Sequence, residues 1–173
     1  KENLLGSPEV NVEKGFAGVR QTVDNTRPLV ASMAVGVARS SLEETRRALQ
    51  QAGVSIDYDA PALSQSAAAA KFIEMEADFE AARLLTLQAA WMADNRKPNS
   101  LQASMAKAKA GRCCVEIALR CVELCGSIGY SENSLLEKWA RDAKILDIFE
   151  GTQQIQQLIV ARRLLGKSSA ELK

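Results

Sequence analysis

Apolar side chains recur at the helical period over a long stretch, and this periodicity limits what the chain can fold into. Four residues between positions 64 and 95, spaced three and four apart, would lie along one face of an α-helix: Phe72, Met75, Phe79 and Ala82. Alanine and leucine are abundant and β-branched runs are short, so the composition also favours helices. We therefore predict a helix over about 64–95.

Three further segments show the same period, and each predicts a long helix. Their expected bounds and core-facing residues are 26–51 (Val30, Ala34, Val37, Ala38), 99–125 (Val115, Ala118, Leu119, Val122) and 152–165 (Ile155, Leu158, Ile159, Arg162). Shorter helices are expected at about 12–23 and 134–145. Long helices joined by short connections pack as antiparallel neighbours. The predicted fold is all-α, an up-down four-helix bundle with additional short helices.

Residues that cap or break helices set the expected ends of these elements. Asn25 or Thr26 can cap a helix that has Pro28 near its first position, so we expect the first helical region to be interrupted there. A loop is expected over 53–63, and Gly166 is expected to end the last helix. The predicted organisation has three parts: a connector at 1–11, a helical bundle domain at 12–167 and a tail at 168–173.

Charge and hydropathy exclude several classes of protein. The net charge is +1, so the composition does not call for nucleic acid or an anionic membrane as a partner. No segment has the roughly 18 apolar residues that a membrane span needs, and no secretory signal is apparent, so we expect a cytosolic protein. The chain has no histidine, so a general base would have to be Asp, Glu, Lys, Tyr or Cys.

Four cysteines fall within one predicted helix: Cys113, Cys114, Cys121 and Cys125. The last two lie four residues apart and could face one metal ion, but two thiolates without histidine are a weak metal pattern. Free cysteine is common in protein cores. We therefore interpret the cysteines as reduced core residues and predict no metal site.

The stretch Phe149–Thr152 places a carboxylate and a glycine where a helix should begin. One interpretation, which the pattern alone favours, is a capping loop that carries a solvated acid. The other is a reaction site, in which Gly151 permits close approach, the helix opened by Thr152 binds phosphate, and apolar neighbours desolvate Glu150 into a useful base. The second interpretation implies a substrate or cofactor that carries phosphate groups.

Three segments resemble the C-terminal helical domain of the acyl-CoA dehydrogenase family, and together they cover nearly the whole chain. They read DNTRPLVASMAVGVARSSLEETRRAL, CGSIGYSENSLLEKWARDAK and RDAKILDIFEGTQQIQQLIVARRLLG. The resemblance implies that an N-terminal helical domain and a middle β domain precede this one, and KENLLG resembles the strand that leaves the β domain. It also implies FAD between the domains, usually in a tetramer, so this chain would be part of a longer enzyme and inactive alone.

The resemblance implies the α,β-dehydrogenation of an acyl-CoA thioester, with Glu150 of the Glu-Gly-Thr signature as the general base. Some relatives place the base at the position that matches Thr26, where this chain has no carboxylate. The resemblance implies substrate contacts by Asp24, Thr26, Arg27, Gly151 and Arg162, and flavin contacts by Glu123, Gly126, Ser127, Thr152, Gln153 and Gln154. It further implies electron-transfer flavoprotein as acceptor and a role in fatty acid and lipid metabolism, in the cytoplasm or, in a eukaryote, the mitochondrial matrix.

Departures from the family leave alternatives open. Many members carry Arg-x-x-Phe-Gly after the first long helix, where this chain reads QQAGVSIDYDAPAL. Glu123 stands in place of a glutamine near the flavin diphosphate, and Gly126-Ser127 replaces a Gly-Gly pair. The sequence is therefore also compatible with a non-catalytic or half-site subunit of a hetero-oligomeric acyl-CoA dehydrogenase, or with an acyl-CoA oxidase-like relative.

Overall fold

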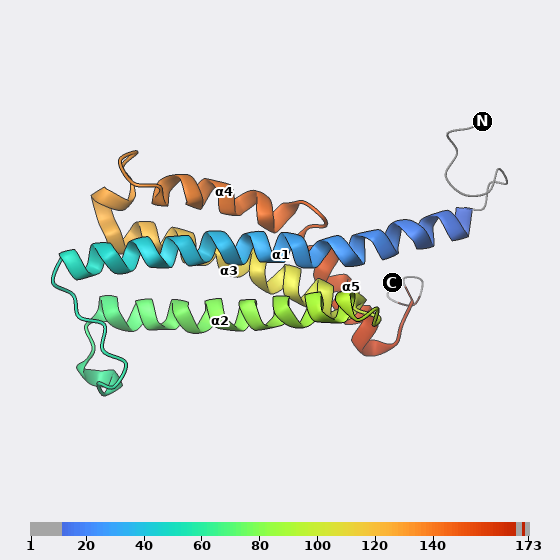
Figure 1. Ribbon diagram of the computed structural model, residues 1–173, viewed down its shortest axis with the longest axis horizontal. Helices are drawn as coiled ribbons and strands as arrows, with labels where there is room; N and C mark the ends of the chain where they lie inside the picture. The colour runs from blue at the N-terminus through green and yellow to red at the C-terminus, as the bar shows by residue number, and fades with distance from the viewer. Residues whose placement is uncertain (1–11, 169–170, 172–173) are drawn as a thin grey trace.

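In the computed structural model, which describes residues 12–168 and 171, all regular secondary structure of the described chain is helical (Figure 1). The elements are α1 (Val12–Gln51), η1 (Ala62–Ser64), α2 (Ala67–Asp94), α3 (Ser100–Gly129), α4 (Leu136–Ile148) and α5 (Gln153–Leu165). The prediction of an all-α fold is confirmed. The predicted connector at 1–11 and most of the predicted tail lie outside the described residues.

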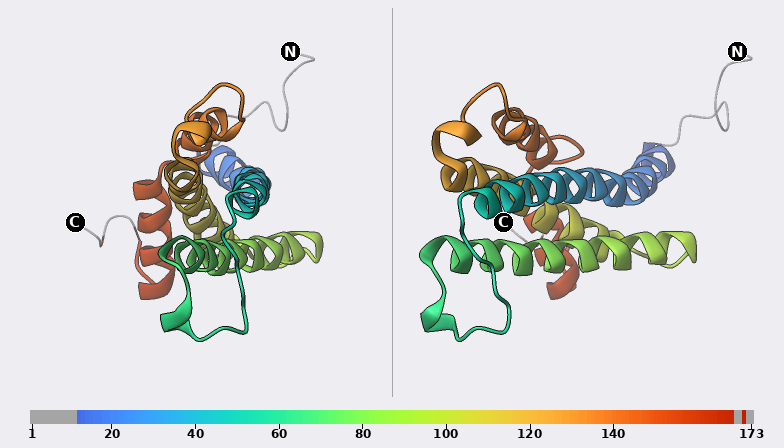
Figure 2. Two further views of the ribbon diagram at one scale, coloured as in Figure 1. Left: turned by 90° about the vertical axis from the view of Figure 1, so that its left-hand side faces the viewer. Right: turned by 60° about the vertical axis from the view of Figure 1, so that its left-hand side comes forward.

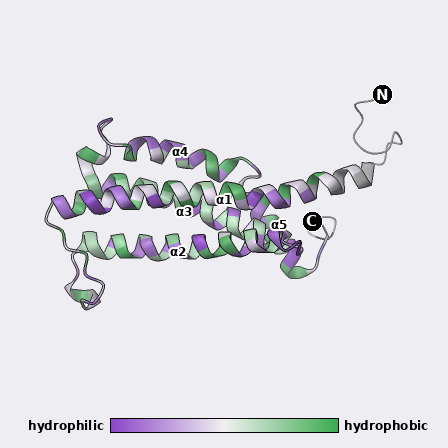
Figure 3. Cartoon of the chain, viewed as in Figure 1, coloured by the Kyte–Doolittle hydropathy of each residue, from purple (hydrophilic) through white to green (hydrophobic). Residues whose placement is uncertain are grey.

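Helices α1 to α4 lie side by side and alternate in direction, which confirms the up-down four-helix bundle (Figures 1 and 2). Helix α3 packs against each of the other four α-helices, and α5 crosses it near its first turns. Hydrophobic and hydrophilic residues alternate along the helices, as expected when each helix turns one face to a core (Figure 3). The largest apolar core side chains include Phe72 and Met75, both fully buried, and each such burial contributes about 1.5–3 kcal/mol.

The predicted break between residues 24 and 28 is wrong, because α1 continues through Pro28 without interruption. Proline has no N–H, so the carbonyl of Asp24 loses the donor it would have inside a regular helix. Asn99 replaces that donor, since its Nδ2 lies 3.3 Å from the Asp24 carbonyl oxygen. The predicted cap residues Asn25 and Thr26 therefore lie inside the helix. A tertiary contact 75 residues away compensates for the proline.

Two predicted core faces are also partly wrong. Leu119 on α3 is 55% exposed, and on α5 the side chains of Ile155 and Leu158 are 47% and 44% exposed. The buried residues of α5 are instead two glutamines, Gln153 and Gln156. Helix α5 faces the bundle with amide groups because polar groups lie opposite it. Gln156 donates to the two carbonyls of the α4–α5 turn, and Gln153 donates to a backbone carbonyl of α3.

Local chemistry explains the remaining helix ends. Ser66 caps α2, and its Oγ accepts a 3.1 Å hydrogen bond from the N–H of Ala69. Helix α3 passes its predicted end because the chain kinks at Gly126 (φ 56°, ψ −133°) and then forms a last helical turn. Gly166 ends α5 in the left-handed conformation, as predicted. None of the described helices is long and apolar enough to cross a membrane.

Candidate active site

The turn between α4 and α5 contains two consecutive residues with positive φ, Glu150 (58°) and Gly151 (102°). A side chain is excluded at Gly151, because a Cβ there would lie 2.4 Å from Nε2 of Gln156. That nitrogen donates to the carbonyl oxygens of Glu150 (3.0 Å) and Gly151 (3.1 Å). The left-handed conformation costs a non-glycine residue about 1–2 kcal/mol, so these hydrogen bonds hold Glu150 in a backbone geometry that it does not prefer.

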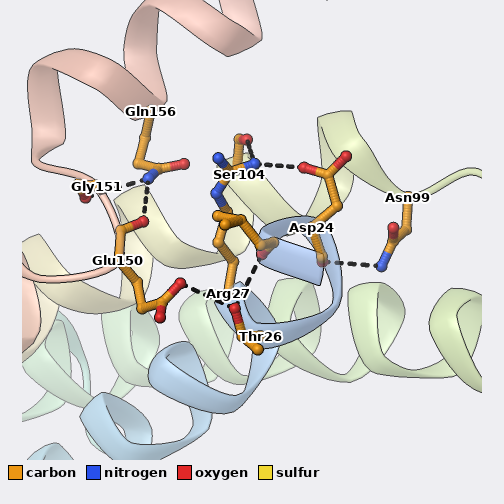
Figure 4. A network of polar contacts seen from close by, with 9 residues as sticks. Asp24, Thr26, Arg27, Asn99, Ser104, Glu150, Gly151 and Gln156 are labelled. Carbon is orange, nitrogen blue, oxygen red and sulfur yellow. Dashed lines mark hydrogen bonds and ion pairs between the residues drawn. The ribbon is translucent and has the colours of Figure 1, made fainter. Parts of the chain in front are cut away.

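The carboxylate of Glu150 lies against α1. Its Oε2 accepts a 2.9 Å hydrogen bond from Oγ1 of Thr26, a residue 124 positions earlier in the chain (Figure 4). Glu150 is half-buried, so its carboxylate is restrained on one side and accessible on the other. The turn thus unites Glu150 and Gly151 with three further predicted site residues on one stretch of α1: Asp24, Thr26 and Arg27.

Arg27 brings a buried positive charge to this site. Arg27 is 8% exposed, and its guanidinium forms an ion pair with Asp24 through Nη1 and lies 3.4 Å from the Ser104 hydroxyl (Figure 4). Burial lowers the pKa of Arg27, while the carboxylates of Asp24 and Glu150 oppose that shift. Its Nε is buried and has no hydrogen-bond partner within the described part of the chain.

Lys107, which the sequence analysis did not single out, is a second buried cation at the site. It is fully buried on α3, and its Nζ donates to the carbonyl oxygens of Gly151 (2.6 Å) and Asp147 (3.1 Å). Burial lowers the pKa of Lys107; Asp147 and Glu150 oppose this shift, and Arg27 adds to it. The sequence did contain a signal, because this lysine occurs at a core position of the α3 period, among buried alanines at 103, 106 and 110.

Asp147 on α4 was missed as well. Its Oδ1 accepts a 2.7 Å hydrogen bond from Nε2 of Gln153, and its Oδ2 lies 3.0 Å from Nζ of Lys144. Burial alone would raise the pKa of Asp147, but the hydrogen bonds from Gln153 and Lys144 and the positive charge nearby lower it below its ordinary value. The one local signal for this arrangement is Lys144, three residues earlier, because Gln153 reaches Asp147 only across the turn.

The start of α5 carries the residues predicted to contact flavin. Thr152 is the N-cap residue, as predicted, although its side chain makes no capping hydrogen bond. Gln153 is turned inward and also donates to the Ala108 carbonyl oxygen (2.6 Å), whereas Gln154 is exposed. Arg162, further along the helix, is half-buried with its Nε lacking a partner among the described residues. Donors available to an outside anion are therefore the exposed Gln154 amide and the N–H groups of the first turn.

The other predicted flavin residues lie far from Glu150. Gly126 forms the kink of α3, Ser127 beside it is exposed, and Glu123 forms an exposed ion pair with Lys71 at 3.3 Å. Nineteen residues separate Gly126 from Lys107, which corresponds to about 28 Å along an α-helix. This group at the α3 end and the Glu150 turn are therefore separate regions of the chain.

The four cysteines are structural. Cys113, Cys114 and Cys121 are buried, and burial raises their pKa values to about 11, 12 and 12. Thiols held neutral in this way are poor nucleophiles and poor metal ligands. Within the described residues, no group of three or more Cys, Asp or Glu side chains is arranged to hold a metal ion.

The fold and the site together define a helical domain that presents one restrained, accessible carboxylate next to a helix N-terminus. The family model described as "Acyl-CoA dehydrogenase, C-terminal domain" matches residues 13–165. The chain therefore belongs to the acyl-CoA dehydrogenase family, and the resemblance noted in the sequence is confirmed.

Curated relatives agree with this assignment. The mitochondrial short-chain specific acyl-CoA dehydrogenase of Rattus norvegicus is 37% identical over 165 residues, which cover 95% of this chain and 38% of that protein. The caffeyl-CoA reductase-Etf complex subunit CarC of Acetobacterium woodii is 38% identical over 167 residues, covering 96% and 42%. The chain thus spans about two fifths of the length of these relatives.

Solved structures show the same fold. The glutaryl-coenzyme A dehydrogenase complex with glutaryl-CoA aligns with a TM-score of 0.83 at 29% identity, over 98% of this chain and 42% of that one. Butyryl-CoA dehydrogenase from Megasphaera elsdenii aligns with a TM-score of 0.79 at 31% identity, over 88% and 39%. The bundle described here is therefore the helical domain that these enzymes share.

Proposed function

We propose that the chain is the C-terminal domain of an FAD-dependent acyl-CoA dehydrogenase and that Glu150 is the general base. The observation that supports this most directly is the Thr26–Glu150 hydrogen bond of 2.9 Å. This bond orients one accessible carboxylate, and the turn that carries it is itself held in place. Thr26 donates this bond, so it holds the carboxylate oxygen in one position relative to α1. No histidine competes for the role, since the chain has none.

The proposed reaction transfers two hydrogens from neighbouring carbons of an acyl-CoA thioester. The α-proton passes to the Glu150 carboxylate, its C–H electron pair forms the Cα=Cβ double bond, and the β-hydrogen leaves with its electron pair. FAD, when bound, supplies the acceptor for that hydride. Gly151 presents no side chain, which leaves room for the Gln156 amide that holds the turn. The buried Arg27–Asp24 pair supports α1 where Thr26 contacts the carboxylate.

The two groups of predicted flavin residues differ in how well their chemistry fits an FAD diphosphate. The N–H groups at the start of α5 and the exposed Gln154 amide are donors, so Thr152, Gln154 and, further along, Arg162 suit an anionic ligand. Glu123 is an acceptor only and does not suit a diphosphate, although Lys71 partly neutralises it. In the proposed enzyme, the α5 end holds the cofactor or CoA phosphates and the α3 end contributes less.

The partners and the location are proposed from the relatives. One of them is named as a subunit of an Etf complex, which supports electron-transfer flavoprotein as the electron acceptor. A tetramer is proposed because the α3 end, about 28 Å from the Glu150 turn by helix geometry, would serve a different site from the one that uses Glu150. Relatives named as mitochondrial support a mitochondrial matrix location in a eukaryote, with the cytoplasm as the alternative.

The test is the substitution Glu150→Gln in the full-length protein, with Glu132→Gln, an exposed acid in the α3–α4 connection, as the matched control. Loss of a general base should slow acyl-CoA oxidation by at least about 10²–10⁴-fold. Exchange of the substrate α-proton with D2O, followed by NMR, measures the base directly and should fall in parallel. Wild-type rates of both processes in Glu150→Gln would remove this residue from the mechanism.

A second candidate function is a half-site subunit of a hetero-oligomeric acyl-CoA dehydrogenase. The exposed carboxylate of Glu123 at the α3 end favours it, because this end would repel the diphosphate of a flavin held mainly by another subunit. Purification of the full-length protein alone decides between the two functions. A colourless, inactive protein that becomes active with a co-expressed relative supports the second candidate, and a yellow active one supports the first. Oxygen consumption with acyl-CoA would instead indicate the oxidase-like alternative.

A further inference from the structure

We propose that Lys107 and Gln156 are positioning residues for Glu150. In this proposal they hold the two carbonyls of the Glu150–Gly151 turn, and so keep the Glu150 carboxylate in place against Thr26. The inference rests on the proposed function of Glu150 as base and adds two residues to that site.

The first argument is geometric. Three hydrogen bonds, from Lys107 on α3 and Gln156 on α5, converge on two consecutive carbonyls at 2.6–3.1 Å. Both side chains are fully buried, so water cannot replace them easily. A positive φ at Glu150 means that relaxation of this turn would swing the carboxylate away from Thr26. A displacement of about 1 Å at a catalytic group can cost about 10²-fold in rate.

The second argument concerns charge. Four other charged groups face the turn from α1 and α4, and they pair with each other: Arg27 with Asp24, and Lys144 with Asp147. The next lysine of α3, Lys109, points to α2 and pairs with Asp78 at 2.6 Å. Lys107 and Glu150 remain as a cation and an anion that form no ion pair within the described residues, linked through the Gly151 carbonyl.

The third argument is that hydrogen bonding alone does not explain a lysine here. An ammonium ion in a protein core costs several kcal/mol, whereas a neutral amide, such as that of Gln156, satisfies carbonyls without that cost. A buried cation is explained if its charge acts on a neighbouring group. Two carboxylates near Lys107, those of Asp147 and Glu150, oppose the effect of burial on it, and Asp147 has the larger influence.

The experiment compares two substitutions with matched controls in the full-length protein. Lys107→Met removes the charge and keeps the length of the side chain, and Lys109→Met makes the same change two residues away on the same helix. Gln156→Leu removes the amide, and Gln157→Leu makes that change at an exposed neighbour. The readouts are the rate of α-proton exchange of an acyl-CoA in D2O as a function of pH, and kcat and KM for oxidation.

We expect Lys107→Met to lower the exchange rate and kcat by about 10–100-fold with little change in KM. Lys107→Gln, which keeps a donor for the Gly151 carbonyl, should recover part of that loss, because the proposed role is a hydrogen bond to the turn. Gln156→Leu should lower both rates in the same way, since it removes the donor to both carbonyls. Both controls should stay within about twofold of wild type, as expected for surface changes.

A folded Lys107→Met protein with the exchange rate and kcat of Lys109→Met would overturn the proposal. If Lys107→Met does not fold, Gln156→Leu decides in its place, because a folded Gln156→Leu with the rates of Gln157→Leu would overturn it as well. Glu150→Gln separates this result from the proposed function. Normal exchange in Glu150→Gln rejects the base itself, whereas loss there with a normal Lys107→Met rejects only the positioning role.

Discussion

Two interruptions of helical structure lie at opposite ends of α3: the Glu150–Gly151 turn and the kink at Gly126. They differ in how their polar groups are satisfied. Near its first turns, α3 supplies Lys107 to the Glu150–Gly151 turn, where buried side chains donate to each carbonyl. At its other end, the kink at Gly126 is surrounded by exposed residues, including Ile128 (67%) and Tyr130 (80%). The carbonyls of the Glu150–Gly151 turn thus find their donors within the chain, whereas the residues around the Gly126 kink face outward.

This difference indicates what each end can do. A turn held by buried hydrogen bonds keeps a reacting group in place before a substrate arrives, as catalysis requires. An exposed kink gains order from whatever molecule covers it. We therefore expect substitutions at the Glu150 turn to alter stability and chemistry together, and those at the Gly126 kink to act mainly on assembly or cofactor retention.

The largest expected effect is that of Gly151→Ala. Its φ of 102° is unfavourable for alanine, and the added Cβ would lie 2.4 Å from Nε2 of Gln156, so a buried hydrogen bond must break. We expect a loss of about 2–4 kcal/mol in unfolding free energy and a fall in kcat of at least about 100-fold. Thermal denaturation and steady-state kinetics of the full-length protein measure both.

Gly126→Ala is the matched control. Its φ of 56° also favours glycine, but a Cβ there would meet nothing within 4 Å. Only backbone strain is expected, about 1–2 kcal/mol, with kcat largely unchanged. Equal effects of the two substitutions on kcat would show that the contrast between the two ends of α3 has no functional meaning.

The sequence was sufficient for the bundle and for the part of the site that lies in local motifs. Helical periodicity predicted four long helices, and glycine at 166 predicted the end of α5, because both depend on residues close together in the chain. The continuity of α1 through Pro28 was not predicted, since it depends on Asn99, 75 residues away from Asp24. Helix propensity is a property of the local sequence, so it cannot predict a hydrogen-bond donor supplied by a distant segment.

The polar inner face of α5 was missed for a related reason. Periodicity assigned Ile155 and Leu158 to the core, whereas the side chains of α5 that face the bundle are two glutamines. They donate to carbonyls of the α4–α5 turn and of α3. Lys107 lies at a core position of an alanine-rich run. It was overlooked because a charged residue is not expected in a core. The site residues that sequence reasoning missed are thus those whose partners are backbone groups from distant segments.

A smaller effect is expected from Asp147→Asn, which keeps an acceptor for Gln153 and removes the charge. The pKa of Asp147 is lowered in the folded protein, so the unfolded chain binds its proton more readily. Its contribution is therefore present above its ordinary pKa of 3.8 and is lost as pH falls through the lower folded value. The difference in unfolding free energy between wild type and Asp147→Asn should accordingly narrow as pH falls from 5 to 2. Urea unfolding in pH steps of about half a unit measures this difference.

The control is Asp142→Asn, because the pair of Asp142 with Lys138 is exposed. A difference between wild type and Asp147→Asn that does not depend on pH would contradict the assignment.

The smallest effect on stability is expected from Glu123→Gln at the outward end of α3. Glu123 and Lys71 are 69% and 41% exposed in their side chains, and such pairs contribute about 0–1 kcal/mol. The free energy of unfolding should therefore change by no more than about 0.5 kcal/mol.

The informative readout is the ratio of flavin absorbance to protein in the purified full-length enzyme. If this end faces a diphosphate, removing the carboxylate should raise flavin content and Lys71→Gln should lower it, because one change removes repulsion and the other attraction. Unchanged flavin content in both variants would mean that the α3 end does not contact flavin. Another molecular surface would then be expected to cover its exposed apolar residues.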